Sequence, residues 1–259
     1  MGICRGRAGK GALPLHNVLM AITSSPERKR RNNSRLRMES LEDRSLLASA
    51  TFQQGIAGYA GTEDTFLKQG DPDANNAAEI ELSIDGLSGG GEVHGLLRFD
   101  SIVGGGFGQV PAGVPIISAT LELEVTNRGH SMQLHRMLRS WNDTDTWNTL
   151  TAGIQADDVE AVSIADVATG TGSVGLLTID VTTSLEAWVG GAGSNQGWAF
   201  LPTGNNGVEF YSAEGLTPPR LIVEFGDGVP NNAPVADDDT YSVDEDTVLN
   251  VPPNGVLGN

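Results

Sequence analysis

The stretch ISATLELEV (117–125) decides the fold class of this chain. From Thr120 onward polar and aliphatic residues alternate, so Leu121, Leu123 and Val125 fall on one face of an extended strand. The side chains between them fall on the opposite face, in water. One apolar and one polar face are typical of a strand in an antiparallel sheet that covers one side of a core. The stretch therefore predicts a half-buried β-strand.

Three other stretches alternate in the same way, at residues 80–84, 97–100 and 221–225. The residues that this pattern assigns to the core are Ile80, Leu82, Ile84, Leu97, Phe99, Leu221, Val223 and Phe225. Between the strands lie glycine-rich stretches at 89–91 and 104–108, which predict loops, because only glycine adopts some backbone angles at little cost.

One helix interrupts the strands. Thr182 or Thr183 is expected to cap it, because a hydroxyl at that position can accept a bond from a free backbone N–H. Two glycines, residues 190–191, are expected to end it. Its buried face consists of Leu185, Trp188 and Val189. Strand count and turn spacing together predict an all-β fold, an antiparallel β-sandwich of jelly-roll type with one short helix.

Charge is divided unevenly along the chain. Residues 1–48 carry ten Lys and Arg against four Asp and Glu, and the remainder carries six against 29, so the net charge of −17 divides into +6 and −23. An acidic body argues against nucleic-acid binding, whose affinity comes mostly from neutralised phosphates. No apolar run approaches ~20 residues, so we expect no membrane span. The only cysteine, Cys4, lies in the basic leader, so the body is expected to fold without disulfides.

Both ends of the chain differ from the strand-rich body. Residues 27–48, ERKRRNNSRLRMESLEDRSLLA, resemble the N-terminal LEDRxLLA sorting motif of large secreted or surface proteins of some bacteria. Residues 229–259 resemble the start of a cadherin-like tandem repeat of bacterial adhesins. A disordered basic tail and a solvated acidic linker are the plainer interpretations. We expect a disordered export leader (1–48), the sandwich (49–226), a linker (227–236) and an incomplete repeat (237–259) within a larger multidomain surface protein.

Five stretches of the body carry a family resemblance. They are HGLLRFD (94–100), ISATLELEV (117–125), LHRMLRSWNDTDTWN (134–148), IDVTTSLEAWVGG (179–191) and PPRLIVEF (218–225). Their order and spacing are similar to the DNRLRE domain, also called carbohydrate-binding module family 96. The resemblance covers roughly residues 50–226. It implies a β-sandwich appended to larger secreted proteins and a ligand among alginate and other acidic polysaccharides.

Two groups of residues are candidates for contact with such a glycan. One is the cationic cluster Arg128, His130, His135, Arg136 and Arg139, since guanidinium groups bind carboxylates bidentately. The other is the tryptophan pair that brackets the acidic turn NDTDT, Trp141 and Trp147, since exposed aromatic rings stack on pyranose faces. For the arginines, pairing with surface acids is the alternative; for the tryptophans, it is core packing.

Clusters of oxygen ligands make calcium a candidate cofactor. The candidate ligands are Asn142, Asp143, Asp145, Asp237, Asp239 and Asp244. Ordinary turn chemistry is the alternative, because Asp and Asn side chains stabilise turns on their own.

No HExxH or phosphate-loop motif is present, so we expect no enzyme. The favoured hypothesis is a non-catalytic carbohydrate-binding or adhesion module of a secreted or cell-surface protein. A calcium-stiffened adhesin domain without sugar binding, and part of a polysaccharide-degrading enzyme, are the alternatives.

Overall fold

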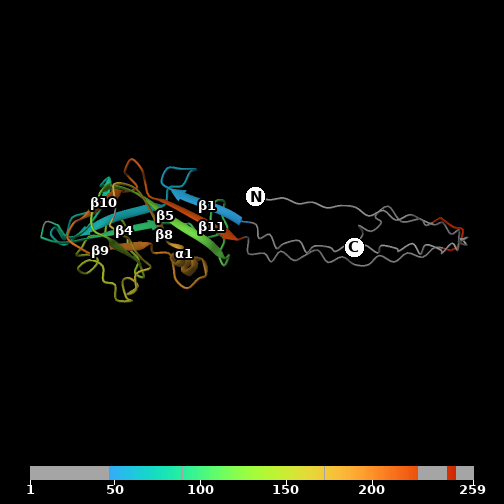
Figure 1. Cartoon of the computed structure of the whole chain (residues 1–259). Helices are drawn as coiled ribbons and strands as arrows, with labels where there is room; N and C mark the ends of the chain where they lie inside the picture. Colours follow the sequence, from blue (N-terminus) through green and yellow to red (C-terminus); the bar gives the residue numbers. More distant parts are fainter. Residues whose placement is uncertain (1–46, 89, 172, 227–243, 249–259) are drawn as a thin grey trace, which may run out of the picture. The chain divides into compact units, whose positions relative to one another are not determined.

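The computed structural model describes residues 47–88, 90–171, 173–226 and 244–248 (Figure 1). Its elements are β1 (Leu47–Gln53), β2 (Thr62–Lys68), β3 (Glu81–Ser88), β4 (Gly91–Phe99), β5 (Ile116–Asn127), β6 (Met132–Arg136), β7 (Val167–Ala168), β8 (Gly175–Asp180), α1 (Thr182–Val189), β9 (Trp198–Pro202), β10 (Val208–Tyr211) and β11 (Arg220–Gly226). All pairings between these strands are antiparallel. The predicted all-β, antiparallel, sandwich-like fold with one short helix is confirmed.

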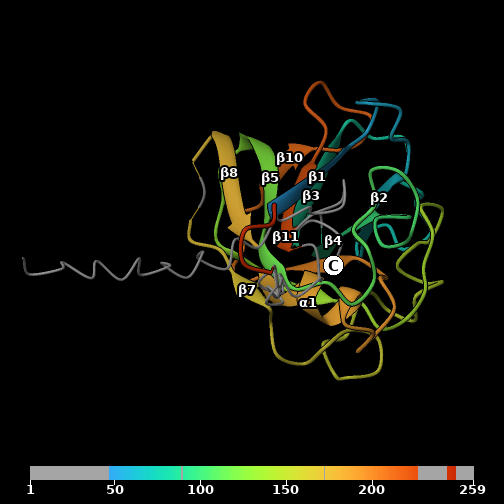
Figure 2. The same ribbon diagram turned by 90° about the vertical axis from the view of Figure 1, so that its right-hand side faces the viewer.

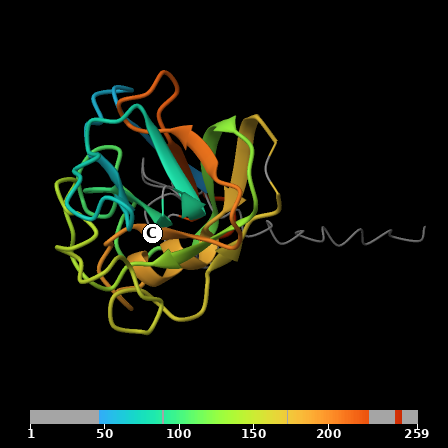
Figure 3. The same cartoon turned by 90° about the vertical axis from the view of Figure 1, so that its left-hand side faces the viewer.

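The strands form one curled sheet that folds over into two layers. Its order is β1-β11-β5-β10-β3-β4-β9-β6-β7, with β8 on the free side of β5 and β2 on the free side of β4. Figures 2 and 3 show β8 beside β5 at the border of the first layer. Strand β3 joins the layers, because it pairs with β10 in the first and with β4 in the second.

The main core lies between the two layers and contains most of the residues that the sequence alternation assigned to it. Leu121, Leu123 and Val125 of β5 are buried there, together with Leu221, Val223 and Phe225 of β11, as predicted. Strand β1 begins at Leu47, which pairs with Gly226 of β11, so the sandwich starts two residues before the predicted border at residue 49. The predicted leader up to residue 46, the linker and most of the repeat lie outside the described residues.

Two local predictions were wrong in detail. Ile80 is 57% exposed rather than buried, because it lies in a bend before β3, where its carbonyl accepts a bond from the Ser212 N–H. The helix forms at Thr182–Val189 with the predicted buried face, but its N-cap residue is Val181. The Thr182 hydroxyl instead donates to Asp180 and accepts a bond from the Ala119 N–H of β5.

A second apolar cluster covers the outer face of the second layer, so β4 is buried on both faces. It brings together strand residues such as Leu96 of β4 and Ala199 of β9 with side chains of the segment 137–166 that crosses over them. Trp141 and Trp147 are the large anchors of this segment. The crossing segment therefore covers two polar side chains that β4 presents on this face, His94 and Arg98.

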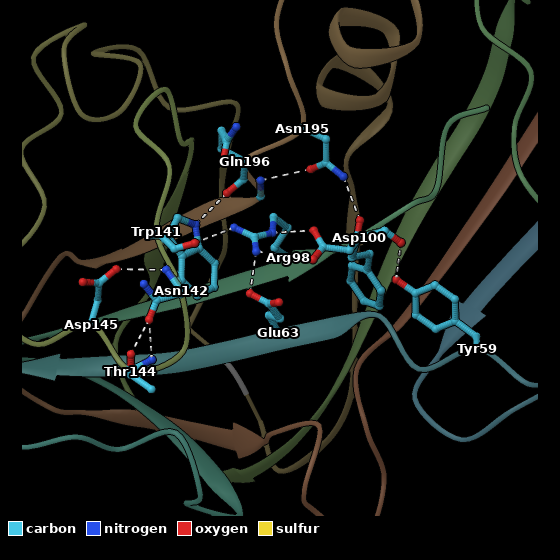
Figure 4. A network of polar contacts seen from close by, with 12 residues as sticks. Tyr59, Glu63, Arg98, Asp100, Trp141, Asn142, Thr144, Asp145, Asn195 and Gln196 are labelled. Atoms are coloured by element: carbon cyan, nitrogen blue, oxygen red, sulfur yellow. Dashed lines mark hydrogen bonds and ion pairs between the residues drawn. The ribbon is translucent and has the colours of Figure 1, made fainter.

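Arg98 is the central polar side chain of that face (Figure 4). Its side chain is 11% exposed, and its Nη2 and Nε lie 2.5 Å from carboxylate oxygens of Glu63 and Asp100. Its Nη1 donates to the Trp141 carbonyl at 2.8 Å, and the guanidinium lies 4.9 Å from the ring centroid of the same residue. Trp141 Nε1 donates to the Gln196 carbonyl. Arg98 thus ties β4 and β2 to the crossing segment.

We expect Arg98→Met to lower the free energy of unfolding by about 3 kcal/mol. The substitution leaves two carboxylates without their cation and removes a donor from a buried carbonyl. Urea unfolding at pH 7 measures the change.

Arg220→Met is the matched control, because Arg220 also pairs with a glutamate, Glu122, but is 42% exposed. An exposed pair contributes less than about 1 kcal/mol. Equal losses in the two variants would contradict the central role of Arg98.

Candidate functional site

A pocket of about 400 Å³ lies between the turn that joins β1 to β2 and the loop that follows β4. This volume is within the range of small-ligand sites in proteins. The lining residues are Thr51, Phe52, Ile56, Ala57, Gly58, Tyr59, Ser101, Gly106, Phe107, Gly108 and Gln109. The pocket is therefore built by two tight loops fixed to the sandwich.

Tyr59 anchors the first loop to the core. Its ring meets Phe52 edge-on, with 5.4 Å between centroids, and its hydroxyl donates to the Asp100 carbonyl at 3.0 Å (Figure 4). Burial raises the pKa of Tyr59 well above its usual value, so the hydroxyl stays neutral. Inside the loop, the Gly55 N–H donates to the Tyr59 carbonyl at 2.9 Å. The turn is therefore held by a hydrogen bond within it and by a second one to the residue that follows β4.

Gln109 closes the second loop with its side-chain amide. Its Oε1 accepts a bond from the Gly106 N–H and its Nε2 donates to the Ser101 carbonyl, both at 2.7 Å. A Cβ at Gly104 or Gly106 would push this amide out of its place, so the two bonds are compatible with glycine at both positions. Phe107, at the tip, is fully exposed. The loop therefore holds an aromatic ring in solvent at the pocket rim.

Two residues that line the pocket have a strained backbone. Ala57 has φ 52° and Ser101 has φ 56°, both in the left-handed region that non-glycine residues rarely adopt. Such conformations cost on the order of 1 kcal/mol each and persist where surrounding contacts enforce them, often at binding sites. One such residue lies in each wall of the pocket, and three others, Thr151, Ala152 and Asp158, lie in the segment 137–166. The pocket is therefore a candidate binding site chiefly because of its volume and lining.

The pocket is chemically simple. Of the described residues that line it, none carries a charge at pH 7, although the chain as a whole carries −17. Apolar and aromatic surface comes from Ile56, Tyr59 and Phe107, and hydroxyl groups come from Thr51 and Ser101. These groups can stack against a flat apolar face and exchange hydrogen bonds with hydroxyls.

The cationic residues singled out from the sequence are divided between several environments. Arg136 Nε lies 2.7 Å from Asp166 Oδ2, and Arg139 Nη1 lies 3.2 Å from Glu160 Oε1, so both guanidiniums are in ion pairs. His135 is buried, with Nδ1 2.8 Å from the Val162 carbonyl. Arg128 and His130 are exposed between β5 and β6. The five side chains do not converge on one surface.

Trp141 and Trp147 are 4% and 6% exposed. Trp141 lies against Arg98, and Trp147 packs against the buried His94, with 4.9 Å between ring centroids. Neither tryptophan has an exposed ring face on which a sugar could stack. Both are packed in the core, which was the alternative interpretation of these residues.

The candidate calcium ligands also occupy ordinary turns where they are described. Asp145 accepts a bond from the Asn142 N–H at 2.9 Å and one from the Thr149 hydroxyl at 2.8 Å, and Asn142 Oδ1 accepts from the Thr144 N–H (Figure 4). Asp143 is exposed, and Asp244 starts a turn closed by Thr247. Asp237 and Asp239 lie outside the described residues. Within the described ranges, no group of three or more His, Cys, Asp or Glu is arranged to hold a metal ion.

Comparisons with known proteins add no relative. No protein-family model matches the chain, and a search of the curated proteins found no match. No helix in the described part of the chain is long and apolar enough to cross a membrane.

Phe107 was not identified as a candidate site residue from the sequence. The glycine-rich stretch 104–108 predicts a loop, and the loop exists, but the single aromatic residue within it was not singled out. A lone phenylalanine flanked by glycines has no neighbour to pack against locally, and this was the available signal.

Two buried titratable side chains lie elsewhere in the fold. Asp64 Oδ2 accepts a bond from the Ala213 N–H at 2.7 Å, and burial raises its pKa to about 7. Burial lowers the pKa of His94, whose Nδ1 accepts a bond from the Ile154 N–H at 3.2 Å while Nε2 lies 3.0 Å from Glu92. Both groups make stability depend on pH.

We expect Asp64→Asn to gain stability relative to the native chain as pH rises from about 4 to about 7, by up to roughly 4 kcal/mol. The folded state holds the Asp64 proton to higher pH than the unfolded state does. The stabilisation is therefore complete below the unfolded pKa and is lost as pH rises through the folded one. The difference in urea unfolding free energy between the two proteins, which cancels the contribution of His94, measures the effect.

Asp158→Asn serves as the control. Asp158 is exposed, and hydrogen bonds from Ser163 lower its pKa, so it is ionised in both states above about pH 5. Its difference curve should be flat between about pH 5 and about pH 7. A flat curve for Asp64→Asn as well would show that Asp64 ionises normally in the folded protein.

Proposed function

We propose that residues 47–226 form a non-catalytic carbohydrate-binding module of a secreted or cell-surface protein, and that the pocket between the two loops holds a sugar ring. The observation that carries the proposal is the fully exposed ring of Phe107 at the rim of a pocket with aromatic walls. Sugars are recognised by aromatic rings that stack on their C–H faces. The resemblance of the strand series to a carbohydrate-binding family agrees with this proposal.

The rigidity of the loops supports binding by a preformed site. The Gln109 amide holds one loop, and the Tyr59 hydroxyl ties the other to the end of β4. A preformed site loses little conformational entropy when it binds a ligand. The backbone next to Phe107 is thereby held by the Gln109 amide.

The chemistry of the lining supports binding without catalysis. Hydrolysis of a glycosidic bond uses two carboxyl groups that face the bond from opposite sides. The described lining residues include no Asp, Glu or His, and the Tyr59 hydroxyl already donates to a backbone carbonyl. This pocket can hold a sugar but offers no general acid to cleave one.

We expect the full chain to be retarded in native gels that contain a polysaccharide it binds, and Phe107→Ala to weaken that binding roughly tenfold. The loss reflects removal of the stacking ring, which contributes nothing to the core. The gels hold neutral glycans (β-glucan, xylan, mannan) or acidic ones (alginate, pectin), each with and without calcium.

Ile164→Ala is the matched control, since Ile164 is an exposed apolar residue outside the pocket. It should bind like the native chain. Retardation by no glycan would overturn the proposal. Calcium-dependent thermal stabilisation together with no glycan binding would favour a structural adhesin domain instead.

A further inference from the structure

We infer that the pocket takes a neutral sugar chain and discriminates against polyuronates such as alginate. This inference rests on the proposed function, and it departs from the acidic ligand that the sequence resemblance implies. It is argued from the distribution of charge around the pocket.

The described lining residues supply no counter-charge for a carboxylate. A uronate carboxylate that enters a protein pocket loses hydration, and this loss is offset only by a cation or by several donors. The polar side chains of the pocket are the hydroxyls of Thr51, Ser101 and Tyr59 and the amide of Gln109. The amide and the tyrosine hydroxyl are already engaged within the loops. The remaining hydroxyls match the hydroxyls of a neutral sugar.

Most cationic side chains of residues 49–259 form ion pairs elsewhere in the fold. Residues 49–259 contain six Lys and Arg, and four of these, Arg98, Arg136, Arg139 and Arg220, are in ion pairs with carboxylates. Neither Lys68 nor Arg128 lines the pocket. Among the described lining residues, none can make a bidentate guanidinium contact, the usual way to hold a carboxylate.

Negative charge lies next to the pocket along β1. Strand β1 contributes Thr51 and Phe52 to the pocket, and its next residue, Gln53, lines a second groove of about 210 Å³. That groove contains Glu122 and Glu124 against the single cation of Arg220. A polyuronate that ran from the pocket along β1 would meet excess negative charge, whereas carboxylates accept hydrogen bonds from neutral sugar hydroxyls.

The test is calorimetric titration of the full chain with soluble neutral glycans (β-glucan, xylan, mannan) and with polyuronates (alginate, polygalacturonate). At about 0.15 M salt we expect tighter binding to at least one neutral glycan than to either polyuronate. That affinity should change less than about twofold between about 0.05 M and about 0.5 M salt, because no ligand charge is screened. Phe107→Ala should weaken it roughly tenfold, and Ile164→Ala should leave it unchanged.

The failures of this inference and of the proposed function are distinguishable. Tighter binding to a polyuronate than to every neutral glycan overturns the inference and leaves a carbohydrate-binding module. Neutral binding that Phe107→Ala does not weaken overturns the assignment to this pocket. Binding to no glycan overturns both proposals.

Discussion

The structure depends on one buried cation. The segment 137–166 covers the outer face of the second layer, and Arg98 lies beneath it with little access to water. A guanidinium in that position must find partners within the protein, because leaving it unpaired would cost several kcal/mol. Glu63, Asp100 and the Trp141 carbonyl supply them. These partners determine where the crossing segment begins and how β4 ends.

The same end of β4 supports the candidate pocket. The Asp100 carboxylate accepts a hydrogen bond from the Arg98 guanidinium, and the Asp100 carbonyl accepts one from the Tyr59 hydroxyl (Figure 4). Ser101, which follows directly, has a strained backbone and lines the pocket. The buried ion pairs and the exposed site are thus linked through two consecutive residues.

Periodicity predicted the main core well and the outer cluster poorly. Leu121, Leu123 and Val125 could be assigned because alternation within one strand reports on the layer that it faces. The alternation around Arg98 predicted that it lies on the other face of the strand from Leu97 and Phe99. It did not predict that a later segment covers that face. That cover depends on contacts between β4 and residues more than forty positions later, which no local pattern encodes. Phe107 was not predicted for a different reason, since an exposed side chain on a loop belongs to no periodic pattern.

The pairing of β1 with β11 has a mechanical consequence. Leu47 lies opposite Gly226, so the two ends of the sandwich are neighbours at one end of the same ladder. A pulling force applied at these two residues would load the hydrogen-bonded pairs one after another, beginning at the outermost. The ladder would peel open at low force instead of resisting as a row of bonds sheared together. Within any longer polypeptide, a sandwich joined through these two residues would add little length and would bear little tension.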